Sequence, residues 1–252
     1  MDHDFEDVEL KINAPQLLEE KLRSKRRRCM IGTGAMSDPY IPIEESLNLT
    51  RACLEVIEKY GFGLAIITKS NLILRDIGLL VDINQKAKCV VQMTLTTFDE
   101  DLCRILEPNV CTTRERFEAL KVLRDRGVRT VVWLCPILPF INDTLENIKG
   151  VLGYCIEAGV YGVLCFGMGM TLREGDREYF YEKLDKHFPG LRSRYEKRYG
   201  NNYELISENS RELMAYFHKT CAENNIVCDT GTLFGFVSTL DDRAGGEQPE
   251  LF

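Results

Sequence analysis

Five short apolar runs alternate with helical patterns between residues 29 and 166, and this alternation constrains the fold more than any other feature of the chain. The clearest run, Leu64 to Ile67, follows a glycine-rich turn and contains no polar residue, which is typical of a strand buried on both faces. The other runs are Cys29–Thr33, Lys88–Leu95, Thr130–Leu138 and Gly162–Phe166. Strands that alternate with helices predict a parallel sheet with right-handed crossover connections.

The segments between these runs have apolar residues at helical spacing and carry start and stop signals. Thr112 and Glu115 form a capping box at one helix start, Gly61 follows another helix as a C-cap, and Glu107-Pro108 stops a third. The predicted helices cover residues 14–22, 44–60, 71–83, 99–106, 112–126 and 143–158.

The pattern changes after Gly167, where charged helical segments replace the strand–helix alternation. Helices are predicted over residues 176–187, 191–199 and 207–224, and the apolar stretch 231–236 is expected to pack back onto the core. The sequence therefore predicts two parts, a partial barrel over residues 1–172 and a C-terminal helical extension over residues 173–252.

Charge and cysteine content argue against several classes of protein. A net charge of −7 disfavours wholesale binding to polyanions. A basic run, Lys21 to Arg28, is either a solvated face or a local phosphate or nucleic-acid contact. No apolar run approaches the roughly 20 residues that span a membrane, and the polar N-terminus lacks a signal peptide, so we expect a cytoplasmic protein without a membrane partner. The ten cysteines and three histidines have no zinc-like spacing, so we expect reduced, mostly structural thiols and no metal ligands.

Polar residues gather where the predicted strands end, which is the edge at which α/β sheets and barrels bind ligands. These residues are Ser37, Asp38, Lys69, Ser70, Thr94, Thr96, Asn142 and Asp143. Lys69 follows a buried strand directly, so its ammonium needs either an anionic partner or an exit to solvent. The alternative for Lys69 is a lysine that only snorkels from the strand end.

Several separated motifs, in order, resemble the radical S-adenosylmethionine (SAM) superfamily and, more narrowly, its spore-photoproduct-lyase-like branch. The motifs, within about residues 7–166, are Ser37-Asp38-Pro39-Tyr40-x-Pro42-x-Glu44, Thr68-Lys69-Ser70-x-Leu72-x-x-Arg75-Asp76, Glu107-Pro108 with Arg114-x-Arg116-x-x-Ala119-Leu120, and Pro136-Ile137-x-Pro139-x-x-Asn142-Asp143. The resemblance implies an α/β fold: a partial parallel (β/α)6 barrel that binds SAM at the carboxyl ends of its strands. It also implies a 4Fe–4S cluster that cleaves SAM reductively to a 5′-deoxyadenosyl radical.

The resemblance implies a cofactor site as well. The loop Met36–Ser37–Asp38 would hold the methionyl amino group, through backbone carbonyls and the Ser37 hydroxyl. Lys69 would meet the methionyl carboxylate or a substrate phosphate.

Further along the chain, Thr94 and Thr96 would face the ribose hydroxyls, and Pro136 and Ile137 would flank the adenine. Glu107 with Arg116 is alternatively a buried structural pair, and Asn142-Asp143 is as consistent with a helix cap as with a ligand-binding pair.

Two departures from the family pattern bear on activity. The CxxxCxxC motif is absent, so the first barrel strand and the cluster ligands are expected upstream of Met1 in a longer protein, the alternative being a degenerate relative. The family's hydrogen-donor cysteine corresponds to Ala35 here, so the resemblance supports radical SAM chemistry better than thymine-dimer repair. The substrate, possibly a nucleic acid, stays open, and an electron donor such as flavodoxin or ferredoxin is implied.

Two further functions compete with this interpretation. One is a non-catalytic barrel that binds a nucleotide or a protein partner and has lost the cluster. The other is a phosphate-binding metabolic barrel that uses Lys69, although the chain lacks the glycine-rich phosphate loop expected after a late strand.

Overall fold

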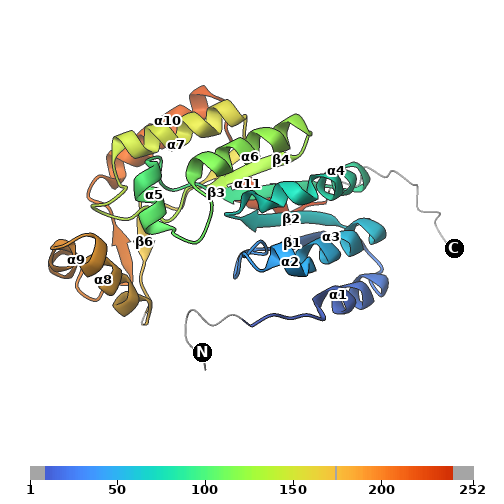
Figure 1. The fold of residues 1–252 in the computed structure, drawn as a ribbon. Helices are drawn as coiled ribbons and strands as arrows, with labels where there is room; N and C mark the ends of the chain where they lie inside the picture. The colour runs from blue at the N-terminus through green and yellow to red at the C-terminus, as the bar shows by residue number, and fades with distance from the viewer. Residues whose placement is uncertain (1–8, 174, 241–252) are drawn as a thin grey trace.

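The computed structural model describes residues 9–173 and 175–240, and hydrogen bonds join the five predicted runs into one parallel sheet whose strands follow chain order (Figure 1). The strands are β1 Met30–Thr33, β2 Gly63–Thr68, β3 Cys89–Thr94, β4 Arg129–Trp133 and β5 Gly162–Leu164. The predicted α/β partial barrel is thereby confirmed. Within the described residues, the outer edge of β1 has no strand neighbour.

One helix precedes β1, and the others connect successive strands, as the spacing predicts. They are α1 Ala14–Arg23, α2 Glu44–Leu47, α3 Leu49–Tyr60, the 3₁₀ helix η1 Asn71–Asp76, α4 Ile77–Lys86, α5 Glu100–Leu106, α6 Thr113–Asp125 and α7 Leu145–Ala158. The Thr112–Glu115 capping box is confirmed at the start of α6. The predicted helix over residues 44–60 is wrong in one respect, because Asn48 adopts a left-handed conformation (φ 55°) and separates α2 from α3.

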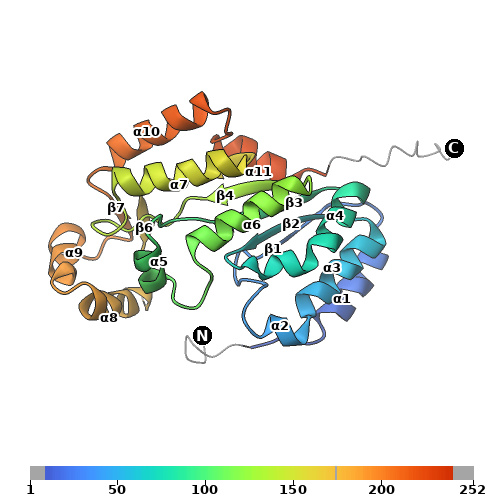
Figure 2. The ribbon, with the colours of Figure 1, turned by 45° about the horizontal axis from the view of Figure 1, so that its top comes forward.

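Side chains alternate between the two faces of the sheet, and each face has its own apolar cluster. The outer face packs Leu64, Val91 and Val132 against α3, α4, α6 and α7. The inner face packs residues from β2 to β5 against the last described helix, α11 Thr230–Ser238, so the sheet separates α6 from α11 (Figure 2). The expected return of residues 231–236 to the core is confirmed.

A close approach between α11 and the sheet depends on Gly162 in β5. A Cβ atom at this position would lie 2.4 Å from the Leu233 side chain and 2.7 Å from the Val227 carbonyl oxygen. Val227 also forms a parallel bridge to Gly162, so a short extended segment flanks β5 on its outer edge. Because Gly162 has no side chain, both the segment at Val227 and helix α11 can pack against β5 at this position.

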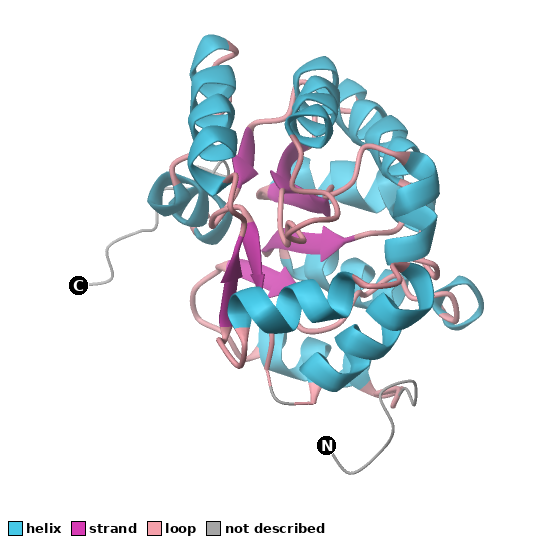
Figure 3. Ribbon diagram, turned by 90° about the vertical axis from the view of Figure 1, so that its left-hand side faces the viewer, coloured by secondary structure: helices cyan, strands magenta, loops and turns pink. Residues whose placement is uncertain are grey.

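The charged segment after β5 forms a small unit at one end of the barrel. It contains β6 Gly169–Thr171, α8 Asp176–His187, α9 Leu191–Tyr199 and β7 Glu204–Ile206, followed by α10 Ser210–Glu223. Strands β6 and β7 pair antiparallel, a pairing that the sequence did not predict. An aromatic cluster that includes Tyr181, Tyr195 and Tyr199 joins α8 and α9, whereas α10 packs into the core of the sheet through Leu213 and Phe217. Figure 3, seen from the side of α8 and α9, shows helices in an arc around the strands.

Two predicted strands run past the carboxyl ends of the observed strands by two residues or more. The run Thr130–Leu138 forms a strand only as far as Trp133, and Pro136 and Pro139, which cannot donate a backbone hydrogen bond, lie in the segment after it. The run Gly162–Phe166 ends at Leu164. None of the described helices combines the length and the apolar character needed to cross a membrane.

Candidate active site at the carboxyl ends of the strands

The loop after β1 is fastened to the end of β2 by Asp38. Its carboxylate accepts hydrogen bonds from Thr68 Oγ1 and the Lys69 backbone N–H, each at 2.7 Å, and from the Tyr40 backbone N–H at 2.9 Å. The loop approaches so closely that a Cβ atom on Gly34 (φ 94°) would lie 2.0 Å from the Ile67 carbonyl oxygen. The Asp38 carboxylate is therefore already bonded to donors of the protein itself, and it joins the loop after β1 to the end of β2.

A second polar network, centred on Asp76, also holds the loop after β1 in place. The Tyr40 hydroxyl donates to Asp76 at 3.1 Å, and the carboxylate of Asp76 is fully buried. Arg75 pairs with Asp76 at 2.8 Å and with Glu44 at 2.9 Å, while Arg51 reaches Asp76 at 2.7 Å. Buried charges need such partners, so the motif residues in this network serve to hold the loop.

Lys69 and Arg116 both pair with Glu107, and the three residues form one ion-pair bridge. Its ammonium lies 2.5 Å from Glu107 Oε1, and Glu107 Oε2 accepts a hydrogen bond from Arg116 at 2.7 Å. Arg116 is fully buried. Burial alone would raise the pKa of Glu107, but the positive charges of Lys69 and Arg116 outweigh burial and lower it. The predicted anionic partner of Lys69 is thus Glu107 in this structure, and the lysine side chain stays 37% exposed toward the cavity.

Backbone carbonyls at and just after the end of β3 accept hydrogen bonds from Arg116 and from residues that follow β4. Arg116 donates to the Thr94 carbonyl at 2.9 Å, and the Asn142 amide donates to the Thr96 carbonyl at 3.1 Å. Asn147 in α7 donates to the same Thr96 carbonyl at 2.8 Å. Residues of all four motifs therefore lie in hydrogen-bonded networks along the carboxyl edge of the sheet.

The pair Asn142-Asp143 does not cap α7. Thr144 is the N-cap, because its hydroxyl accepts from the Asn147 backbone N–H at 3.2 Å. Asn142 instead holds its own loop, accepting from the Leu138 N–H at 2.6 Å. Asp143 accepts from Ser207, just before α10, at 2.5 Å; burial nevertheless raises the pKa of Asp143. The cap interpretation is therefore wrong, and the pair ties the barrel to the segment that follows β7.

The predicted cofactor residues separate into groups. Lys69, Thr96 and Pro136 line one cavity of about 580 Å³ between the sheet edge and α8. Ser37 and Asp38 instead line a groove beside β1, and Met36 is 98% exposed. Thr94 is buried with its carbonyl bound to Arg116, and Ile137 is fully buried in the outer core.

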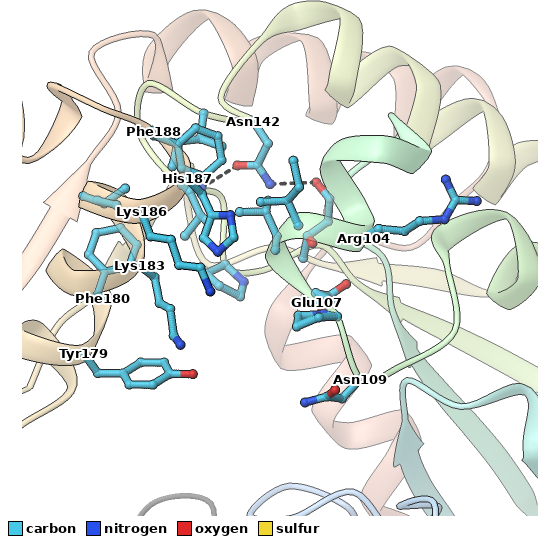
Figure 4. Close-up of a pocket in the computed structure, with 18 of the residues that line it drawn as sticks. Arg104, Glu107, Asn109, Asn142, Tyr179, Phe180, Lys183, Lys186, His187 and Phe188 are labelled. Carbon is cyan, nitrogen blue, oxygen red and sulfur yellow. Dashed lines mark hydrogen bonds between the residues drawn. The ribbon is translucent and has the colours of Figure 1, made fainter.

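The far wall of the cavity consists of residues that the sequence analysis did not select. Tyr179, Lys183, Lys186 and His187 project from α8 toward Glu107 and Asn109 (Figure 4). Their spacing of three and four residues, within an otherwise acidic helix, is the signal that would have predicted a common cationic face.

The residues of this structure fit one implied cofactor better than the other. Lys69, Thr96 and Pro136 supply a cation, a hydroxyl and an apolar surface in a cavity of ligand size, which suits SAM. Within residues 9–173 and 175–240, no group of three or more His, Cys, Asp or Glu could hold a metal ion, and all ten cysteines of the chain lie in these ranges. The described cysteines therefore do not fit a 4Fe–4S cluster.

Curated relatives of the chain are uncharacterized proteins. Two of them, from Mycobacterium bovis and Mycobacterium tuberculosis, are each 31% identical over 193 residues, which cover 76% of this chain and 56% of the relative. A third, from Methanocaldococcus jannaschii, is 34% identical over 143 residues, covering 57% of this chain and 52% of the relative. No protein-family model matches the chain. The chain thus spans about half the length of the curated relatives it matches.

One solved structure shows the class of fold, and a second is less similar. Spore photoproduct lyase complexed with dinucleoside spore photoproduct superposes with a TM-score of 0.54 at 12% identity, covering 86% of this chain and 65% of the other. A structure of anSMEcpe with bound AdoMet gives a TM-score of 0.45 at 12% identity, covering 82% and 57%. The chain has the five-stranded, partial-barrel fold of radical SAM enzymes.

Proposed function

We propose that this chain forms the SAM-facing and substrate-facing part of a radical SAM enzyme of the spore-photoproduct-lyase-like group. The observation that carries the proposal is the set of hydrogen bonds along the carboxyl edge, in which the motifs that resemble this group contact one another or the same strand ends. In this proposal the cluster ligands lie in sequence outside residues 1–252, and a flavodoxin or ferredoxin supplies the electron.

Each cavity residue has a stated role in the proposal. Lys69, held by Glu107 but still partly exposed, binds the methionyl carboxylate as a compact point charge. Thr96 offers its hydroxyl to the ribose, and Pro136 provides an apolar surface for the adenine. The loop Met36–Asp38 presents backbone carbonyls to the methionyl amino group. SAM, when bound, would supply a hydrogen-abstracting radical. The side chains named here hold and orient the SAM molecule.

The test compares SAM binding by Lys69→Met with binding by the unaltered protein, both translated from the complete reading frame and measured by calorimetry under anaerobic conditions. Methionine keeps the apolar stem and removes the charge. Losing a hydrogen bond to a charged group weakens binding by roughly 1.5–3 kcal/mol, or about ten- to a hundredfold. Lys59→Met, in the exposed ion pair between Lys59 of α3 and Glu19 of α1, is the matched control. An affinity within twofold for Lys69→Met would remove Lys69 from the site.

The lack of a cluster-like group among the described cysteines favours a second candidate, a non-catalytic barrel that binds a nucleotide or a protein partner. The complete protein, reconstituted anaerobically with iron and sulfide, separates the two candidates. Four iron atoms per chain and release of 5′-deoxyadenosine from SAM are expected for the enzyme. SAM binding without iron uptake or 5′-deoxyadenosine would establish the binding module instead.

A further inference from the structure

The basic residues Lys183 and Lys186 of helix α8 line the cavity, whereas no acidic residue of this helix does. The cavity face carries Tyr179, Lys183, Lys186 and His187. The acidic residues Glu178, Glu182 and Asp185 line a different depression together with Arg177, and Arg192 of α9 pairs there with Asp185 at 2.9 Å. The cavity side of α8 also includes the apolar Phe180 and Leu184, so its charged members are all basic and stand beside an apolar surface.

The cavity has little negative charge to balance this face. Glu107 is the one carboxylate among the cavity-lining residues, and both of its oxygens are already bonded to Lys69 and Arg116. Neither Lys183 nor Lys186 has an ion pair within the part of the chain that the structure describes; the Lys183 ammonium lies 4.8 Å from the Tyr179 ring centroid. In Figure 4 the two lysines extend into the space in front of Glu107, while Arg104 points away from α8.

We propose that the Tyr179–Lys183–Lys186–His187 face of α8 binds the phosphate group of a phosphate-bearing substrate. The identification of this ligand as a substrate rests on the proposed function; the phosphate site itself does not. Two ammonium groups and an imidazole on adjacent turns can surround a tetrahedral dianion, whereas a single carboxylate needs only one such partner.

The position of this face complements that of Lys69. Lys69, Thr96 and Pro136 line the sheet side of the same cavity, so a ligand held there and a phosphate held on α8 would face each other across it. The aromatic ring of Tyr179, beside Lys183, also offers a surface on which an unsaturated ring of the ligand can stack. The phosphate can belong to a free nucleotide or to a nucleic-acid strand, since both present the same group.

The experiment measures binding of three probes to the complete protein by calorimetry: a nucleoside monophosphate, the same nucleoside without its phosphate, and a single-stranded oligonucleotide. The monophosphate or the oligonucleotide should bind at least about tenfold more tightly than the nucleoside. The variant Lys183→Gln/Lys186→Gln should lose at least about tenfold in affinity for the phosphate probe that binds. Lys197→Gln, an exposed lysine on α9, is the control and should stay within twofold.

The arms of this experiment separate the sources of phosphate and the two proposals. Much tighter binding of the oligonucleotide indicates a nucleic-acid strand, and equal binding indicates a free nucleotide; either result supports the phosphate site. Failure of both phosphate probes to bind better than the nucleoside overturns it, as does an equal loss in Lys197→Gln. Phosphate binding is measured without SAM, so a failed SAM test of Lys69→Met with intact phosphate binding refutes the proposed function alone.

Discussion

The two walls of the cavity differ in whether their charged side chains are buried in ion pairs or exposed without one. On the sheet side, Arg116 is completely buried and donates to the Cys111 carbonyl, the Thr94 carbonyl and Glu107. On the α8 side, Lys183 and Lys186 reach toward open space and have no ion pair among the described residues. A charge without solvent must be held by the protein, whereas a charge left in solvent can exchange water for a ligand. The difference teaches that the sheet wall holds its charges in fixed ion pairs, whereas the helix wall leaves two ammonium groups available to an anionic ligand.

The largest test of this comparison removes the charge of Glu107. Glu107→Gln keeps the shape of the side chain but leaves the buried Arg116 guanidinium without its anion. Breaking a buried pair from one side destabilises a protein by about 3–5 kcal/mol, which urea unfolding measures directly. Asp101→Asn, in the exposed Arg104–Asp101 pair, should change the free energy of unfolding by less than about 1 kcal/mol. Similar losses in the two variants would contradict the contrast.

The pH dependence of unfolding tests the contribution of Glu107 to stability independently. The pKa of Glu107 in the folded protein lies below its ordinary value of 4.5, so its contribution to stability is fully present above that pH. The contribution is lost as the pH falls through the lowered pKa. Glu107→Gln should therefore show a shallower loss of stability below pH 4.5 than the unaltered protein, and parallel curves would count against the bridge.

A smaller effect is expected from the loop that the sheet wall holds. Gly34→Ala places a side chain at a positive φ and drives its Cβ atom against the Ile67 carbonyl. We expect a loss of about 1–3 kcal/mol in the free energy of unfolding, together with weaker SAM binding, because the loop must move away from β2. Gly153→Ala, where a Cβ atom meets nothing within 4 Å on α7, is the matched control. An unchanged unfolding midpoint for Gly34→Ala would show that the loop adapts without strain.

The smallest expected effect belongs to the helix wall. Because Lys183 and Lys186 form no ion pair among the described residues, Lys183→Gln/Lys186→Gln should change the free energy of unfolding by less than about 0.5 kcal/mol per substitution. Thermal and urea unfolding of the double variant test this. A loss comparable to that of Glu107→Gln would mean that these lysines serve the fold and not a ligand.

The sequence predicts the sheet well because its signals are local. An uninterrupted run such as Leu64–Ile67, or a capping box such as Thr112–Glu115, needs no knowledge of distant residues. The pairing of β6 with β7 depends on segments more than 30 residues apart that carry no run of apolar residues, so periodicity could not reveal it. The same limit explains Asn142, whose partner is a carbonyl 46 residues away.

The residues of the candidate site were likewise predictable only where a local signal marks them. Lys69 could be selected because a lysine at the end of a buried strand demands a partner, but its pairing with Glu107 depends on the position of α5. Tyr179, Lys183 and Lys186 looked like an ordinary charged helix, since only the packing of α8 decides which of its faces meets the barrel.

The late position of α11 in the chain has a consequence for synthesis. The inner face of the sheet includes Ala65, Val90, Val131 and Leu164, and it is covered by Leu233 and Val237 of α11. A ribosome that adds about 5–20 residues per second makes the last strand several seconds before it makes this helix. During that interval the growing chain carries a nearly complete sheet with one apolar face bare. Until α11 has been made, the residues that it covers on this face lack the cover that they have in the folded protein, so we expect them to be exposed to solvent.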